Sequence, residues 1–227
     1  MLSSGRPSTG QLCPRGGHRL PKSRAHYRIV VMGAAAVGKS AIISQFLYDR
    51  FVKEYKATVE DLHRGEYDVN GMHLILDILD TSGTHSFPAM RKLAIATGDA
   101  FVLVYSVDDD SSFSAVKQLR DEIIEEKNSE DVPIVIAANK TDVTEERRVI
   151  GRETAETLVC IEWGNGYIEA SAKDNINIVG IFKEILRQSN IQYALSPAVR
   201  RRRRSMPAVL VQRRQLDPPK RHSCSLN

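Results

Sequence analysis

Short apolar runs alternate along the chain with stretches in which apolar residues recur at helical spacing. The most continuous runs cover residues 29–32, 74–79, 100–107 and 132–138, and residues 167–170 form a weaker fifth. Continuously apolar runs of this length are typical of strands buried on both faces, as in a parallel sheet covered by helices. The pattern predicts an α/β domain.

Two later stretches show a helical period. Apolar residues recur at i, i+3, i+4, i+7 and i+8 in Ile178, Ile181, Phe182, Ile185 and Leu186, and a similar stripe contains Phe113, Val116, Leu119 and Ile123. Helices placed between and after the strand-like runs are typical of a doubly wound sheet.

One pair of strands is expected to be antiparallel. Asn70-Gly71 separates the strand-like residues 66–69 and 72–76, and Asn-Gly favours the tight turn of a hairpin. We therefore predict a doubly wound, mostly parallel six-stranded sheet with one antiparallel hairpin pair.

Charge is distributed unevenly. Residues 1–28 contain six basic residues and no acidic ones, and residues 196–227 contain nine basic residues and one acid, Asp217. Because the whole chain carries +4, the residues between these ends carry −10. An acidic body with basic ends argues against a nucleic-acid-binding core and places any anionic partner at the termini.

Composition divides the chain into three parts. We expect residues 1–26, rich in Ser, Gly, Pro and Arg, to be a flexible basic extension, residues 27–190 to form the folded domain, and residues 191–227 to be a disordered basic tail. The three cysteines form no CxxC pair, which argues against a disulfide framework or a zinc site. No apolar run reaches the roughly 18 residues that span a bilayer, so we expect a cytosolic or peripheral protein.

The segment GAAAVGKS, residues 33–40, satisfies the phosphate-loop pattern between a predicted strand at 27–32 and a helical stretch. Gly33 and Gly38 allow the backbone to curl, so that successive amides converge on phosphate oxygens. Lys39 would reach the β- and γ-phosphates, and Ser40 would ligate Mg²⁺.

The segment AANKTD, residues 137–142, ends a predicted strand, where open α/β sheets bind ligands. Asp142 can accept two hydrogen bonds from guanine, whereas adenine would leave the buried carboxylate unpaired at a cost of a few kcal/mol. Asn139 would hold the loops together, and Lys140 would cover the base with its aliphatic stem. Ala172, in the later segment Ser171-Ala172-Lys173, could donate its amide to the guanine oxygen.

These motifs occur in an order that resembles the Ras family of small GTPases over residues 27 to about 190: GAAAVGKS, Thr58, Asp80 to Gly83 (DTSG), NKTD and SAK. Within the family, residues 59–67, 76–83 and 87–109 look most like the dexamethasone-induced Ras and Rhes subgroup, with Di-Ras proteins next. The resemblance implies a Ras-like P-loop GTPase domain that switches between GTP and GDP, binds Mg²⁺ and hydrolyses GTP.

The resemblance also implies residue roles. Thr58 would ligate Mg²⁺ and meet the γ-phosphate, Asp80 would hold Mg²⁺ through water, and the Gly83 amide would meet the γ-phosphate. Phe51 would pack on the guanine and Tyr55 would shield the phosphates. The full expected nucleotide set is Gly33, Ala36, Val37, Gly38, Lys39, Ser40, Ala41, Phe51, Tyr55, Thr58, Gly83, Asn139, Lys140, Asp142, Ser171, Ala172 and Lys173.

A possible partner surface follows the switch threonine. Val59, Glu60 and Asp61 would face effector proteins, although an ordinary solvated strand edge explains them equally well. The exchange factor and the activating protein are not identified by the sequence.

The expected catalytic set, Lys39, Thr58, Gly83 and Thr84, contains one departure from the family. Thr84 stands where most Ras-like proteins carry the glutamine that orients the attacking water, and its hydroxyl has a shorter reach and fewer bonding groups. A methyl at Ala35 could also obstruct a catalytic arginine. We predict slow hydrolysis; the alternative is a GTP-loaded, non-hydrolysing scaffold anchored by its tail. His85 is a weaker candidate for a substitute base.

The tail supports several interpretations. The run Arg200, Arg201, Arg202, Arg203 and Arg204 is a solvated segment, a patch for anionic membrane or a nuclear-import signal. Ser205 resembles a phosphoserine site for 14-3-3 adaptor proteins. Cys224 has the spacing of a prenylated cysteine, but Ser225 and Asn227 are unusual there, so prenylation and a free thiol both stay open. The expected location is the cytoplasmic face of the plasma membrane; cytosol or nucleus is the alternative.

Overall fold

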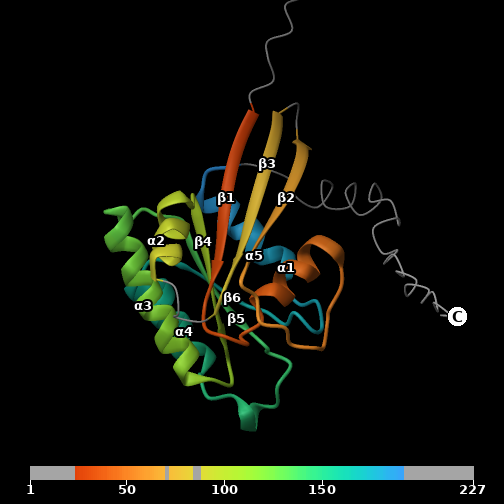
Figure 1. Ribbon diagram of the computed structural model, residues 1–227. Helices are drawn as coiled ribbons and strands as arrows, with labels where there is room; N and C mark the ends of the chain where they lie inside the picture. The colour runs from red at the N-terminus through yellow and green to blue at the C-terminus, as the bar shows by residue number, and fades with distance from the viewer. Residues whose placement is uncertain (1–23, 70–71, 84–87, 192–227) are drawn as a thin grey trace, which may run out of the picture.

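The computed structural model describes residues 24–69, 72–83 and 88–191. Within them, one six-stranded sheet has the order β2-β3-β1-β4-β5-β6 (Figure 1). Its strands are β1 (Arg24–Met32), β2 (Glu60–Val69), β3 (Met72–Thr81), β4 (Ala100–Ser106), β5 (Ile134–Asn139) and β6 (Gly166–Glu169).

The pairing of the strands agrees with the prediction. β2 and β3 are antiparallel, and every other neighbouring pair is parallel. The predicted α/β fold with one antiparallel pair is therefore confirmed. The turn expected at Asn70-Gly71 lies outside the described residues.

Helices cover both faces of the sheet (Figure 1). They are α1 (Lys39–Tyr48), α2 (Pro88–Thr97), α3 (Asp110–Lys127), α4 (Arg152–Thr157) and α5 (Ile178–Gln188), with a 3₁₀ turn η1 (Glu145–Arg147) and a π-helical turn η2 (Leu158–Glu162). None of the helices in the described ranges is both long and apolar enough to cross a membrane.

The core is divided by the sheet into two halves. Ile29 and Val31 of β1 pack toward α1 and α5, whereas Val30 and Met32 pack toward α2, α3 and α4. Successive side chains of a strand point to opposite faces, so a strand covered by helices on both sides must be apolar at every position. This explains the continuous runs in the sequence.

Two helices and part of two strands were missed by the sequence prediction. Helix α2 buries only Ala94 and Ile95, and α4 buries only Ala155, so neither has a clear apolar stripe. Strand β1 begins at Arg24, and β2 begins at Glu60 although its first half is polar. β2 lies at the edge of the sheet, where pairing with β3 supplies its backbone hydrogen bonds without requiring two buried faces.

Candidate nucleotide-binding site

A cavity of about 540 Å³ lies where the parallel strands end. Its walls come from the phosphate loop and the start of α1, from residues 48–58, from β2 and β3, and from the loops after β5 and β6. Predicted site residues that line it are Ala36, Gly38, Lys39, Ser40, Ala41, Phe51, Tyr55, Thr58, Asp80, Gly83, Asn139, Lys140, Asp142, Ala172 and Lys173. Gly33, Val37 and Ser171 are buried and do not line it.

The two glycines of the phosphate loop are required by close approach. Gly33 has a φ of 146°, and a Cβ there would lie 2.1 Å from the Val104 carbonyl oxygen. Gly38 has a φ of 101°, and a Cβ would lie 2.2 Å from Nδ2 of Asn139. Ala36 adopts a left-handed φ of 59°, which costs a residue with a side chain about 1 kcal/mol or more. The phosphate loop is therefore curled and packs closely against β4 and β5.

The side chain of Lys39 contacts the backbone of this loop. Its Nζ donates to the carbonyl oxygens of Gly33 (2.9 Å) and Ala34 (2.7 Å). Burial lowers the pKa of Lys39 to about 8, and the negative charge of Asp80 opposes that shift. A phosphate in the cavity would be a stronger partner than two neutral carbonyls, so this ammonium group is placed to bind an anion.

Three oxygen-bearing side chains lie beside Lys39. The hydroxyls of Ser40 and Thr58 are 2.8 Å apart, and the buried Oδ1 of Asp80 has no hydrogen-bond partner among the described residues. Burial raises the pKa of Asp80, whereas a hydrogen bond from Ser40 and the charge of Lys39 act to lower it. A buried carboxylate with one unpaired oxygen next to two hydroxyls fits Mg²⁺, which prefers oxygen ligands and keeps several waters.

Asn139 joins the phosphate loop to the loop after β6. Its Nδ2 donates to the Val37 carbonyl at 2.8 Å, and its Oδ1 accepts from the Ala172 amide at 3.1 Å. The Ala172 amide, expected to meet the guanine oxygen, is thus also bonded to Asn139. These bonds correspond to the joining role that the sequence suggested for Asn139.

Asp142 is oriented by its neighbours at the rim of the cavity. Oδ1 accepts a hydrogen bond from Ser171 at 2.8 Å, and Oδ2 accepts one from Lys173 at 2.9 Å. Burial acts to raise the pKa of Asp142, but the bonds from Lys173 and Ser171 outweigh it and hold the pKa below its ordinary value. An ionised, fixed carboxylate can accept the two N–H groups on one edge of guanine.

Comparison with known proteins agrees with this geometry. A model of the Ras family matches residues 28–191. The chain belongs to the Ras family. The GTP-binding protein Rhes of Homo sapiens is 44% identical over 184 residues, which cover 78% of this chain and 69% of that protein. Rhes of Mus musculus and of Rattus norvegicus are each 44% identical over 181 residues, covering 76% of this chain and 68% of theirs.

Membership of the Ras family establishes the activity class. The chain is a small GTPase that acts as a switch, and its resemblance to the Rhes subgroup is confirmed. Ras-family GTPases bind GTP and GDP, typically with Mg²⁺, and the cavity described above contains the side chains for both ligands.

The loop that carries the switch threonine in this Ras-family chain is largely exposed. Phe51 is 36% exposed and Tyr55 is 65% exposed, although both line the cavity. Val59 is 75% exposed and Glu60 begins β2. Asp61, the third residue of the expected effector edge, has a side chain that is 66% exposed and also lines the cavity. Thr84 and His85 lie outside the described residues.

Asp61 and His63 form a wall that sequence reasoning missed. Asp61 pairs directly with Asp80 across the β2–β3 ladder, and His63 pairs with Ile78. Nε2 of His63 lies 3.4 Å from a carboxylate oxygen of Asp61. Residues two apart in a strand share a face. The spacing of Asp61 and His63 therefore indicates that both face the cavity, but only once the pairing of Asp61 with Asp80 is known.

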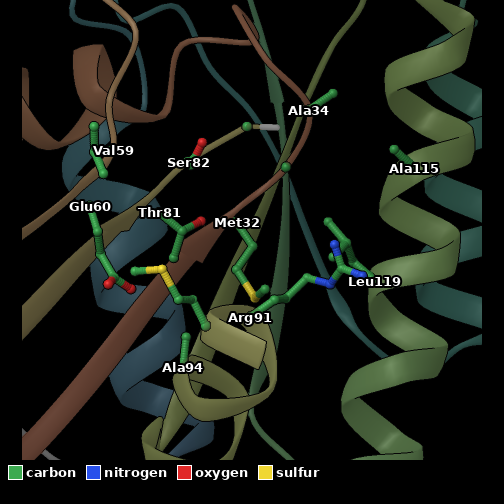
Figure 2. Close-up of a pocket in the computed structure, with 13 residues that line it drawn as sticks. Met32, Ala34, Val59, Glu60, Thr81, Ser82, Arg91, Ala94, Ala115 and Leu119 are labelled. Atoms are coloured by element: carbon green, nitrogen blue, oxygen red, sulfur yellow. The ribbon is translucent and has the colours of Figure 1, made fainter. Parts of the chain in front are cut away.

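A smaller hollow lies behind the phosphate loop (Figure 2). It has a volume of about 50 Å³ and is lined by Met32, Gly83, Met90, Arg91 and Leu119, among others. This is room for only a few water molecules. It lies between the start of β2 and the end of β3 on one side and α2 and α3 on the other, and Gly83, which is expected to meet the γ-phosphate, lines it.

Proposed function

We propose that this Ras-family chain binds Mg²⁺-GTP and hydrolyses it slowly, so that its GTP state is long-lived. The single observation behind slow hydrolysis is Thr84 in the place of the water-orienting glutamine. Most residues predicted to bind the nucleotide line one cavity, and this supports tight nucleotide binding combined with weak chemistry.

The side chains of the cavity have separate roles. Asp142 accepts the two guanine N–H groups, and Lys39 exchanges the carbonyls of Gly33 and Ala34 for phosphate oxygens. Ser40 and Thr58 would supply hydroxyls to Mg²⁺, and the ion would neutralise charge that develops on the phosphates. Loss of the γ-phosphate removes the partner of Thr58 and of the Gly83 amide, which would release the exposed loop at 49–59.

The same geometry suggests why an activating protein would act poorly. A Cβ on Gly83 would lie 2.4 Å from Cα of Ala35, so Ala35 stands against the start of the segment that carries Thr84. We propose that the methyl group of Ala35 obstructs an arginine finger, which supplies a factor of ~10³ to 10⁵ in related enzymes.

Single-turnover hydrolysis tests the proposal. We expect Thr84→Gln to hydrolyse bound GTP faster than the wild-type chain, because the longer amide can both donate to and accept from the attacking water. Thr84→Val, of similar shape but without a hydroxyl, is the control for any contribution of the threonine. GDP release should be the same in all three. Equal hydrolysis by wild type and Thr84→Gln would refute slow hydrolysis through Thr84.

Nucleotide content separates the switch from the competing scaffold. A slow switch purified from cells should contain GDP together with GTP, and the GTP fraction should fall during incubation with Mg²⁺. A non-hydrolysing scaffold would keep its GTP unchanged. Pull-downs with GTP-analogue and GDP forms would then test whether exposed Val59 and Glu60 bind effectors.

We further propose that the tail brings the chain to the cytoplasmic face of the plasma membrane. The support is the run of five arginines at 200–204, each worth about 1 kcal/mol near an anionic surface, with Cys224 as a possible second anchor. Mass spectrometry of the C-terminal peptide distinguishes a prenylated Cys224 from a free thiol. Phosphorylation at Ser205 would reduce the positive charge of the patch.

A further inference from the structure

A groove of about 530 Å³ lies at the opposite end of the sheet from the nucleotide cavity. Residues 130–133 before β5, residues 164–168 at the start of β6 and the end of α5 form its walls, together with Cys160 of η2. The groove is where β5 and β6 begin, whereas nucleotide-site residues follow their ends. It is therefore a surface that the nucleotide does not use.

The groove is acidic. Three carboxylates line it, Glu130, Asp131 and Glu184, against the single guanidinium of Arg187. Arg187 is bonded to Glu184 at 2.8 and 2.6 Å. Glu130 and Asp131 are exposed and have no ion pair within the described residues. Two carboxylates are thus available for an additional cation.

The thiol of Cys160 responds to the same environment. Burial raises its pKa, and the charges of Glu156 and then Glu184 raise it further. The charges of Glu156 and Glu184 therefore reach the groove wall that Cys160 forms.

The floor suits long side chains. Val132, Pro133 and Ile168 are half-buried and line the groove together with the carboxylates. Arginine places its aliphatic stem on apolar surface while its charged end reaches a carboxylate or a solvent-facing oxygen. The groove thus matches a short peptide that contains several arginines.

We propose that this groove binds residues 200–204 of the same chain. Ile191 is held at the end of α5, where its amide donates to Leu186 at 3.0 Å, and Gln188 already lines the groove. Eight residues, 192–199, separate this point from Arg200. Fully extended they span about 26–29 Å, so the arginines can reach the groove from where the described chain ends.

Because residues 192–199 connect the arginines to the folded domain, weak contacts are enough to dock them in the groove. Exposed ion pairs are individually weak and screened by salt, but a short covalent connection raises the local concentration of the segment to the order of millimolar. The docked segment withholds its arginines from anionic lipid, so the groove and a membrane compete for it. This docking is independent of how fast the chain hydrolyses GTP.

Amide NMR spectra of the full GDP-bound chain test the proposal. Replacing all five arginines with glutamine should shift the amides of residues 130–132 and 164–166 at low salt, and the difference should disappear at high salt. The difference should also be lost in Glu130→Gln/Asp131→Asn. Glu145→Gln/Glu146→Gln is the matched control, because it neutralises two adjacent exposed acids outside the groove and should keep the difference.

Limited trypsin digestion gives a second measure, since a docked segment is protected. Cleavage within residues 200–204 should be about two- to fourfold faster in Glu130→Gln/Asp131→Asn than in wild type, as expected for a segment docked half to three-quarters of the time. Three outcomes would overturn the proposal. They are unchanged groove amides, shifts that grow with protein concentration because a second copy supplies the tail, and shifts that require phosphatidylserine vesicles because the groove faces the membrane.

Discussion

Replacing Asn139 with alanine should open the nucleotide site, because one buried amide joins two of its walls. Asn139 is 2% exposed, and its two hydrogen bonds link the Val37 carbonyl to the Ala172 amide. Asn139→Ala would leave that carbonyl and that amide buried without the partners they have now.

The expected magnitude follows from those two groups. A buried polar group left unpaired costs about 1–3 kcal/mol, so the two together cost about 2–6 kcal/mol out of a total stability of about 5–15 kcal/mol for a typical domain. We expect the free energy of unfolding to fall by at least about 2 kcal/mol. Because that loss falls on the walls of the cavity, GDP release should accelerate by about 30-fold or more.

Urea denaturation at a fixed GDP concentration measures the first quantity, and release of a fluorescent GDP analogue measures the second. The control is Asn175→Gly, which removes one exposed hydrogen bond to Asp49 and keeps a left-handed φ that glycine tolerates. Its stability should change by less than about 1 kcal/mol. If Asn139→Ala behaved like this control, the two loops would not be joined through the Asn139 amide.

Three more predictions test the site and the sheet. Gly38→Ala should weaken nucleotide retention, because its Cβ would collide with Nδ2 of Asn139 at 2.2 Å; unchanged GDP release would contradict this. Because burial lowers the pKa of Lys39 to about 8 and phosphate should raise it, GDP binding should take up protons above about pH 8, measurable by calorimetry in buffers of different ionisation enthalpy. Hydrogen bonds from Arg64, followed by the hydrogen bond from His26, hold the pKa of Asp77 at about 2 against the opposing effect of burial. The ionised Asp77 should therefore stabilise the fold fully above about pH 4, and this stabilisation should be lost as the pH falls toward 2. The dependence of the urea midpoint on pH should therefore be weaker in Arg64→Gln.

The sequence predicted the strands best where burial is two-sided. β4 and β5 are buried at every position, and both were recognised as apolar runs. The sequence did not predict α2, because two of its apolar residues face outward, with Met90 41% and Leu93 64% exposed. A helix that buries only Ala94 and Ile95 has no need of a wide apolar stripe, and its sequence therefore lacks the periodic signal.

What the sequence alone determined is the chemistry of each loop. The glycines of the phosphate loop, the lysine that follows and the carboxylate at Asp142 are defined by contiguous residues, since local spacing fixes backbone conformation and the groups that it presents. Only the tertiary structure decided which loops meet. The register of β2 with β3 placed Asp61 and His63 in the nucleotide cavity, Asn139 reached a carbonyl 102 residues away, and the acidic groove arose from three distant segments. Such contacts depend on how elements pack, and no contiguous pattern encodes them.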